Sequence, residues 1–307
     1  MSAGGGTKAI VAALLANAGI AVAKFVGFLI TGSSSMLAES VHSVADTSNQ
    51  GLLLLGQKTA KRKANIEHPF GYGRDRYFYS FIVALMLFTL GSAFALYEGI
   101  HKIQEPEALS SPIVAVVILV VAIILESLSF RTAIVESRLI KGDVTWWQFI
   151  RQSRTPELPV VLLEDAGALF GLVFALIGVG LATVTGDPVW DAVGTLMIGV
   201  LLGVIAIILI IEMKSLLIGE GATPRELDLI VDELAAGRIE RVIHIKTQYI
   251  GPDELLVAAK VSMTSGLAVE EVAQAIDDAE HRVRAKVPAA RLIYIEPDLD
   301  RSTAATS

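Results

Sequence analysis

The sequence predicts a membrane protein in which an all-α bundle of six transmembrane helices precedes a small α+β domain. The mean hydropathy of the 307-residue chain is +0.60, and its long apolar runs stop near residue 215. Beyond that point the composition is typical of a soluble domain. We therefore expect a transmembrane domain over residues 1–215, an α+β domain over 216–300 and a disordered tail over 301–307. The chain has no cysteine, which excludes disulfides and thiolate metal sites.

Each predicted transmembrane helix is an apolar stretch of about 20 residues or more, the length that crosses a bilayer. Six stretches fit this description, at about 8–31, 35–57, 77–100, 112–132, 158–184 and 189–213. The first follows a short glycine-containing start that lacks a small-residue cleavage signature. We expect it to be a retained span and not a cleaved signal peptide.

Basic residues are distributed unequally over the loops between these stretches. The segments 31–35, 101–112 and 185–191 hold a single lysine between them. The segments 58–76 and 131–157 together hold eleven lysine and arginine residues. Because cytoplasmic loops of membrane proteins are enriched in such residues, we expect both basic loops, and both termini, to be cytoplasmic.

The region 216–300 predicts a helix, two strands, a second helix and a third strand. Thr223 and Pro224 suit the N-cap and the first position of the first helix. The strands are expected in "ERVIHIKTQYI", "LLVAAKVSM" and "ARLIYIEPD", and the second helix in "LAVEEVAQAIDDAEHRVRAKV". This order indicates an open α+β sandwich with its helices on one face.

The second apolar stretch carries ionisable residues in its interior, where each costs about 2.5 kcal/mol or more. His42 and Asp46 are four residues apart, and Glu39 lies one turn earlier on a neighbouring part of the face. Because side chains four apart share a helical face, an imidazole nitrogen and a carboxylate can converge there. A histidine with oxygen ligands suits a divalent ion such as Zn²⁺.

A second acidic pair, Glu164 and Asp165, lies in the fifth apolar stretch. Two buried acidic helices repel one another unless a positive species lies between them, which favours metal or proton binding. The alternative is a purely structural role, in which the histidine hydrogen-bonds a neighbouring helix. Adjacent residues lie about 100° apart around a helix, so we expect one of the two acids to face the shared site. Periodicity does not decide which one.

Several segments together resemble the cation diffusion facilitator family of metal/proton antiporters. They are "SSSMLAESVHSVADTSNQ", "HPFGYGRDR", "LGSAFALYEGIHKI", "DAVGTLMIGVLL", "MKSLLIGEGA", "IGPDELLVAAKV" and "YIEPD". The resemblance covers nearly the whole chain and implies six spans, cytoplasmic termini, a homodimer and a cytoplasmic ferredoxin-like domain of the metallochaperone type. The sequence "LLED" that contains Glu164 is similar to the branch that includes mitochondrial zinc exporters.

The resemblance also implies a transport site with two ligands in the second span and two in the fifth. Carried over, three of them are His42, Asp46 and Asp165, and the fourth falls on Val161, which cannot bind a metal. The fourth ligand would then be water, a bidentate carboxylate or one of the remaining acids, Glu164 and Glu39. A site with one imidazole and more oxygen could also accept manganese, iron or cobalt, so the preference for zinc rests on the branch.

Two further metal sites of better-known bacterial members are incomplete in this sequence. In the loop after the second span His68 alone matches, and in the soluble domain His244 remains while Lys260 occupies a matching place. We therefore expect the soluble domain to dimerise without a binuclear zinc cluster. We also expect His68 to pack or hydrogen-bond within its own turn.

These observations predict a secondary transporter that exports a divalent cation, Zn²⁺ first among the candidates, from the cytoplasm in exchange for protons. The expected partners are the metal ion, protons, membrane lipid and a second copy of the chain, without nucleic acid or a prosthetic group. No organelle address is visible, so a bacterial cytoplasmic membrane is the simplest location. One rival is a non-transporting subunit of a heteromeric transporter. An enzyme, such as a membrane metalloprotease, is not expected because the sequence lacks a His-Glu-x-x-His pattern.

Overall fold

The computed structural model describes residues 3–106 and 111–299, and for residues 3–16 it describes the backbone alone. The tail predicted at 301–307 lies outside the described residues. The chain divides into two units. Residues up to 58 form the first unit together with 78–214, and residues 59–77 form the second together with the part from 215 onward.

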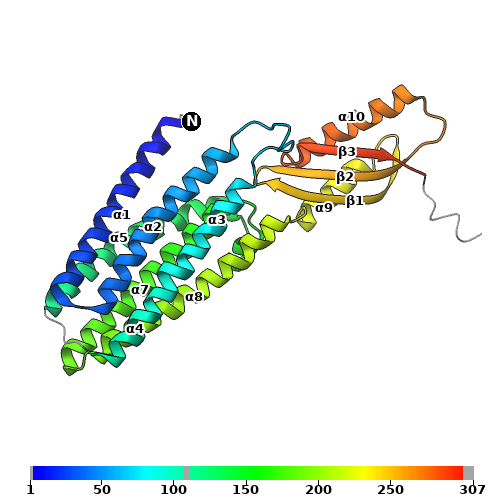
Figure 1. Cartoon of the computed structure of the whole chain (residues 1–307). Coiled ribbons are helices and arrows are strands. Elements are labelled where there is room, and N and C mark those ends of the chain that lie inside the picture. The colour runs from blue at the N-terminus through cyan, green and yellow to red at the C-terminus, as the bar shows by residue number, and fades with distance from the viewer. Residues whose placement is uncertain (1–2, 107–110, 300–307) are drawn as a thin grey trace, which may run out of the picture. The chain divides into compact units, whose positions relative to one another are not determined.

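Six long helical segments build the first unit within the described residues (Figure 1). They are α1 (Ala3–Thr31), α2 (Ser34–Ala60), the continuous run of α3 (Asp75–Met86), η1 (Leu87–Ala93) and α4 (Phe94–Gln104), then α5 (Pro112–Lys141), α7 (Glu157–Thr185) and α8 (Val189–Ile218). Each segment contains one of the predicted apolar stretches. The predicted helical bundle is therefore confirmed.

Four of these segments in the described chain are long and apolar enough to cross a membrane. They are Asp75–Gln104, Pro112–Lys141, Glu157–Thr185 and Val189–Ile218. The apolar part of α1 in which side chains are described is shorter, at Asn17–Thr31. In α2 the polar residues of the helix interior lower its hydropathy. The topology with six spans therefore stays a prediction.

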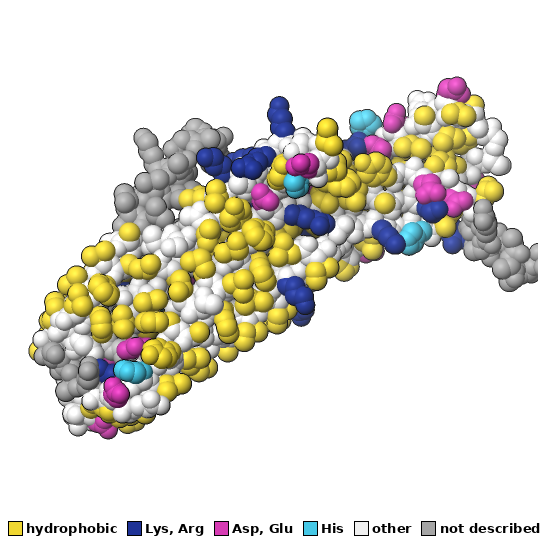
Figure 2. Space-filling view, viewed as in Figure 1, with side chains coloured by type: hydrophobic (Ala, Val, Ile, Leu, Met, Phe, Trp, Pro, Cys, Tyr) yellow, Lys and Arg dark blue, Asp and Glu magenta, His cyan; other side chains and the backbone are white. Residues whose placement is uncertain are grey.

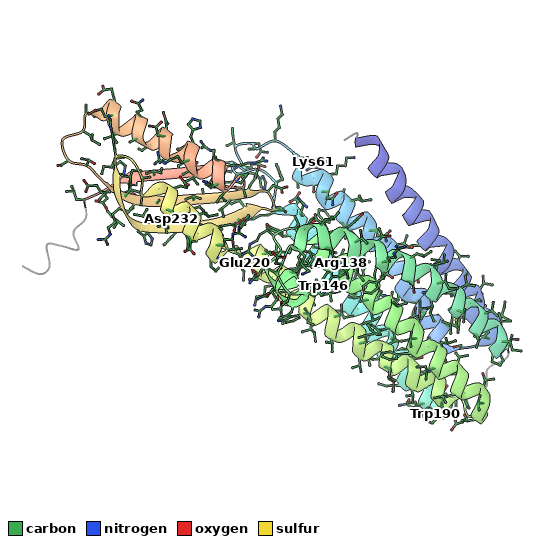
Figure 3. The ribbon with its side chains drawn as sticks, turned by 180° about the vertical axis from the view of Figure 1, so that it is seen from behind. Lys61, Arg138, Trp146, Trp190, Glu220 and Asp232 are labelled. Carbon is green, nitrogen blue, oxygen red and sulfur yellow. The ribbon has the colours of Figure 1, made fainter. Side chains whose placement is uncertain are left out.

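The surface of the bundle has the features of a membrane-embedded protein. The side seen in Figure 2 is mostly hydrophobic, and Lys and Arg side chains gather towards one end. Figure 3 places Arg138 and Trp146 at one end of the bundle and Trp190 at the other. Trp146 and Trp190 are 36% and 41% exposed. Tryptophan at such positions is typical of the two membrane interfaces.

The segment between the fourth and fifth apolar stretches contains more helix than the sequence predicts. Helix α5 continues to Lys141 and ends at Gly142, whose φ of 59° favours glycine. The predicted end at 132 was wrong because the hydropathy falls there, while the following charged residues remain good helix formers. A short helix, α6 (Trp146–Gln152), follows, and Thr145 forms a capping box with Gln148.

Helices α7 and α8 cross at close range because each has a glycine at the contact. A Cβ atom on Gly178 would lie 2.9 Å from the carbonyl oxygen of Trp190, and one on Gly194 would lie 2.9 Å from that of Phe174. Any larger residue would therefore push the two helices apart. This contact with α8 occupies one face of α7, so it helps to determine which face of α7 packs against the other helices.

The second unit contains a three-stranded sheet and two helices in its described part. The elements are α9 (Pro224–Leu234), β1 (Ile239–Gly251), β2 (Glu254–Met263), α10 (Val269–Lys286) and β3 (Leu292–Pro297). Their order is the predicted one, and Thr223 caps α9 as expected. Strand β2 pairs antiparallel with β1 and parallel with β3. The finer ferredoxin-like assignment stays a prediction.

One face of β2 forms the core of this second unit. Its buried residues and those of the two helices are Leu255, Val257, Ala259, Val261, Ile230, Leu234, Ala279 and Val283. Because alternate residues of a strand point to opposite faces, the residues between them point away from the helices. On that second face His244 and Tyr294 are exposed.

Candidate functional site

Helix α2 places the imidazole of His42 beside the carboxylate of Asp46. The His42 Nδ1 atom lies 3.4 Å from Asp46 Oδ1, and the two side chains are 1% and 13% exposed. The pair forms because residues four apart share a helical face. Ser43 and Asn49 are also buried. The polar face of α2 therefore points into the bundle.

Helix α7 brings Glu164 to this face. Glu164 Oε1 accepts a hydrogen bond from Asn49 Nδ2, and the Glu164 carboxyl group lies close enough to that of Asp46 to interact with it. Asp165 turns towards α5, where Ser129 Oγ donates a hydrogen bond to Asp165 Oδ2 at 3.0 Å. Of the two adjacent acids, Glu164 therefore contacts α2 and Asp165 contacts α5.

Several polar atoms at this junction have no hydrogen-bond partner among the described residues. They are Glu39 Oε1, both ring nitrogens of His42, Asp46 Oδ1 and Asn49 Oδ1. Because nearly all buried polar atoms in proteins are hydrogen-bonded, this concentration indicates a place for a ligand. Within the described chain, no three His, Asp or Glu side chains already surround a point suited to a metal ion. Side chains would therefore have to move to coordinate one.

Lys24, in α1, is a charged residue of this junction that the sequence analysis did not single out. Its buried ammonium group lies 3.1 Å from Glu39 Oε2 and 2.8 Å from Ser43 Oγ. The side chain of Glu39 packs against Gly171 of α7, where a larger residue would clash, because a Cβ atom there would lie 2.6 Å from Glu39 Oε1. One oxygen of Glu39 is thus already engaged by a cation, which weakens its candidacy as a metal ligand.

Glu126, in α5, is a second ionisable residue missing from the sequence-based set. Its side chain is buried, and it is close enough to Lys24, Asp46 and Asp165 to act on them electrostatically. Lys24 and Glu126 are the charges in the interior of their apolar stretches, away from Lys8 and Arg131 at the ends. Since such residues are costly in a membrane, this signal alone could have identified both.

A different group of buried polar residues lies at the other end of α2. Asp191, at the start of α8, accepts hydrogen bonds from Ser33 Oγ at 2.8 Å and from the N–H and Oγ of Ser34 at 2.8 and 3.0 Å. Ser35 Oγ donates a further bond to it. The carboxylate of Asp191 thereby caps the N-terminus of α2 and ties it to α8.

His68 lies in the second unit, in the turn that follows α2. Its ring stacks on Tyr72, with 4.5 Å between the ring centroids. Its backbone N–H donates a hydrogen bond to Asn65 Oδ1 at 2.6 Å. His68 therefore packs within its own turn, as the sequence predicts.

His244 lies on the exposed face of the sheet and pairs in register with Lys260. The Lys260 ammonium group donates hydrogen bonds to Glu296 at 2.9 Å and to Asp298 at 3.4 Å. The bond with Glu296, and then that with Asp298, raises the pKa of Lys260. His244 therefore lies beside a lysine that is engaged by two acids, and the expected absence of a zinc cluster stays a prediction.

Comparisons with known proteins identify the family. Residues 10–218 match the family model "Cation efflux transmembrane domain". The mouse (Mus musculus) proton-coupled zinc antiporter SLC30A9, mitochondrial, is 33% identical over 258 residues, which are 83% of this chain and 45% of that protein. Metal tolerance protein C4 of Arabidopsis thaliana is 28% identical over 266 residues, 86% of this chain and 58% of that protein. Zinc transporter ZitB of Pectobacterium atrosepticum is 34% identical over 119 residues, 39% and 36% of the two chains.

The chain spans about half the length of the first two of these relatives. The segment 10–218 that matches the family model includes most of α1, all of the other long helices of the bundle, and every residue of the junction between α2 and α7. Together with the four membrane-capable helices, it identifies a multi-pass integral membrane protein. The chain belongs to the cation efflux family, as the sequence predicts, in the branch that contains SLC30A9.

Proposed function

We propose that this chain is a secondary transporter that exports a divalent metal cation, Zn²⁺ foremost, from the cytoplasm in exchange for protons. The observation that carries the proposal is the buried His42–Asp46 pair beside Glu164 of α7. Both ring nitrogens of His42 and Oδ1 of Asp46 lack hydrogen-bond partners among the described residues. The names of the mouse and Pectobacterium relatives, a zinc antiporter and a zinc transporter, support the same cargo.

The proposed ligands of the transported ion are His42 and Asp46 from α2 with an acid from α7. Glu164 is the acid that contacts α2, and Asp165 is the one that the family resemblance implies. Zn²⁺ accepts one imidazole with carboxylate oxygens in a tetrahedral arrangement, and a water molecule can complete the set. Glu39 is the weakest candidate, since Lys24 already holds one of its oxygens.

Coupling to protons follows from the same atoms. A metal ligand must lose its proton before it binds, so a metal ion and protons compete for one site. Two carboxyl groups that lie close together can share a proton, so Asp46 and Glu164 offer a place for H⁺ when the metal has left. Movement of α2 relative to α7 would then expose the site to each side of the membrane in turn.

The wider architecture that we propose agrees with this mechanism. All six long helices of the described bundle would span the membrane, with the basic loops on the cytoplasmic side. Residues 216–300 would form a cytoplasmic ferredoxin-like domain that dimerises two copies of the chain without a zinc cluster. The simplest location remains a bacterial cytoplasmic membrane.

Flux into proteoliposomes tests the proposal. The purified chain is reconstituted with a pH gradient, and uptake of Zn²⁺ is followed together with release of H⁺. We expect Zn²⁺ uptake that depends on the pH gradient and is lost in His42→Ala. The exposed loop residue Asp143, changed to Asn, is the control that should leave uptake unchanged.

The rival role is that of a non-transporting subunit, which Val161 in place of a ligand favours. Val161 packs against the apolar cluster of Ala133, Phe149 and Leu162, and its side chain has no polar atom. Absence of flux for Zn²⁺, Mn²⁺, Fe²⁺ and Co²⁺ in a correctly folded sample would support this rival. Preference for Mn²⁺ in the same competition would retain transport and change the cargo.

A further inference from the structure

A separate pocket lies between α2, α5 and α7, nearer to the end of the bundle that carries the basic loops. Its volume is about 330 Å³, and its polar lining residues are Gln50, Gln57, Glu136, Ser137 and Glu157. Gln50 is one turn after Asp46 on α2, and Glu157 is two turns before Glu164 on α7. The pocket therefore begins directly beyond the candidate transport site.

The pocket contains polar atoms without partners. Ser137 is 0% exposed, and its Oγ has no hydrogen-bond partner in the part of the chain that is described. On the opposite wall, the Oε1 atom of Gln50 is also buried and has no hydrogen-bond partner among the described residues. A buried hydroxyl and a buried amide oxygen without partners are costly unless a polar ligand or its water reaches them. Two such atoms in one pocket indicate a polar occupant.

The charges of the pocket indicate the sign of this occupant. Glu136 is exposed at the rim, and Glu157 is 8% exposed in the first turn of α7. The loops that follow α2 and α5 are rich in lysine and arginine, and they would repel a divalent cation. Glu157 has an interaction partner of its own, and with Glu136 it brings negative charge to this basic background, which favours a cation.

The size of the pocket indicates a hydrated ion. Six water molecules at about 30 Å³ each occupy roughly 180 Å³, which fits within the 330 Å³ available. By contrast, the narrow gap lined by Ser43, Asp46 and Glu126 in the described bundle has no room for a water molecule. An ion bound beside Asp46 in this gap would therefore have lost water.

We infer that this pocket is a loading site, in which a hydrated divalent cation waits before it is dehydrated at His42 and Asp46. Glu136 and Glu157 attract the ion, and Gln50 and Ser137 accept and donate hydrogen bonds with its water shell. The inference rests on the proposed transport function and adds a second cation site to it. Selectivity then arises at the inner site, because Mg²⁺ gives up its water reluctantly and Zn²⁺ does so more readily.

Transport kinetics provide the first test. In proteoliposomes, Glu136→Gln combined with Glu157→Gln should raise the KM for Zn²⁺ about three- to tenfold, while Vmax per folded protein stays within about twofold. Asp143→Asn removes an exposed acid just beyond α5, outside the pocket, and should leave KM unchanged. If the double variant does not fold, the exposed Glu136→Gln alone carries the test. An unchanged KM would overturn the inference and leave the transport proposal intact.

Binding of Mn²⁺ provides a test that does not need flux. The electron paramagnetic resonance signal of hydrated Mn²⁺ weakens when the ion binds, so it reports binding to detergent-solubilised protein. In a chain that carries His42→Ala and Asp46→Asn, Mn²⁺ should still bind weakly, and adding Glu157→Gln should reduce the bound fraction about threefold or more. Absence of binding in the first background overturns the loading site. Binding without any flux in the unchanged protein would instead contradict the transport proposal.

Discussion

Asp46 on α2 and Asp191, which bonds the start of α2, are both acids inside the same helical bundle, yet their surroundings differ. Asp191 receives hydrogen bonds from three serines and one backbone N–H. Asp46 lies 3.4 Å from His42, and its Oδ1 has no partner in the described structure. Burial alone therefore does not separate the acid that we propose as a ligand from a structural one. The hydrogen-bond complement does, because a saturated carboxylate has no lone pair left for a ligand.

Glu39, which pairs with Lys24, is intermediate between Asp46 and Asp191 in the number of hydrogen bonds it accepts. One oxygen of Glu39 is bound to the Lys24 ammonium group, and the other has no partner among the described atoms. The pair lies close to Asp46 and places an ammonium group beside several acids. We interpret Lys24 as the group that allows α2 and α5 to carry so many carboxylates in a membrane.

Removing Lys24 should have the largest effect on stability. Lys24→Met leaves Glu39 as a buried charge without its partner, which costs about 3–5 kcal/mol. We expect the free energy of unfolding, measured in mixed detergent micelles, to fall by this amount. Lys58→Met, at the exposed end of α2, is the matched control. Addition of Glu39→Gln to Lys24→Met should restore most of the loss, and failure to do so would show that Lys24 does more than neutralise Glu39.

Asp46→Asn should have the largest effect on transport. Loss of a residue that merely supports a metal ligand costs roughly 10–100-fold, so loss of a ligand should reduce Zn²⁺ flux about a hundredfold, or about 2.7 kcal/mol. The fold should survive, since asparagine has nearly the same shape and removes an unpaired charge. Flux and unfolding are measured on the same preparation. Normal flux in this variant would remove Asp46 from the site.

The helices were largely predictable from the sequence, because apolar length and turn chemistry are local properties. The six stretches and the order of elements after Thr223 follow from these signals. The end of α5 and the whole of α6 were not predicted, since both lie where hydropathy no longer reports on helix formation. Gly142 and the Thr145 cap were the local signals that would have placed them.

The site was predictable only in part, because its geometry depends on contacts between helices. The i, i+4 spacing was enough to bring His42 and Asp46 together. The choice between Glu164 and Asp165 depends on the rotation of α7, which the close contact with α8 at Gly178 and Gly194 helps to set. No spacing rule contains that information. Lys24 was missed for a different reason, since it acts through Glu39 and matches no ligand pattern.

Asp191→Asn should show the reverse of Asp46→Asn. The amide leaves one or more serine donors without an acceptor, which costs about 2 kcal/mol. The free energy of unfolding should therefore decrease, while Zn²⁺ flux per folded protein stays within about twofold. Both quantities are obtained from the measurements used for Asp46→Asn. A loss of flux without a loss of stability would mean that the anchor at the start of α2 takes part in transport, and the contrast between the two acids would not hold.

The smallest expected effect is the difference in KM for Zn²⁺ between Glu164→Gln and Asp165→Asn. This comparison identifies which of the two acids on α7 binds the ion. Both changes remove one charge at adjacent positions of α7, so each controls for the other. Because Glu164 contacts Asn49 and Asp46 while Asp165 contacts Ser129, we expect Glu164→Gln to raise the KM for Zn²⁺ about tenfold more, or about 1.4 kcal/mol. The opposite order would mean that Asp165 binds the ion, as the family resemblance implies. Since adjacent residues are separated by about 100°, α7 would then have to rotate by that angle when metal binds.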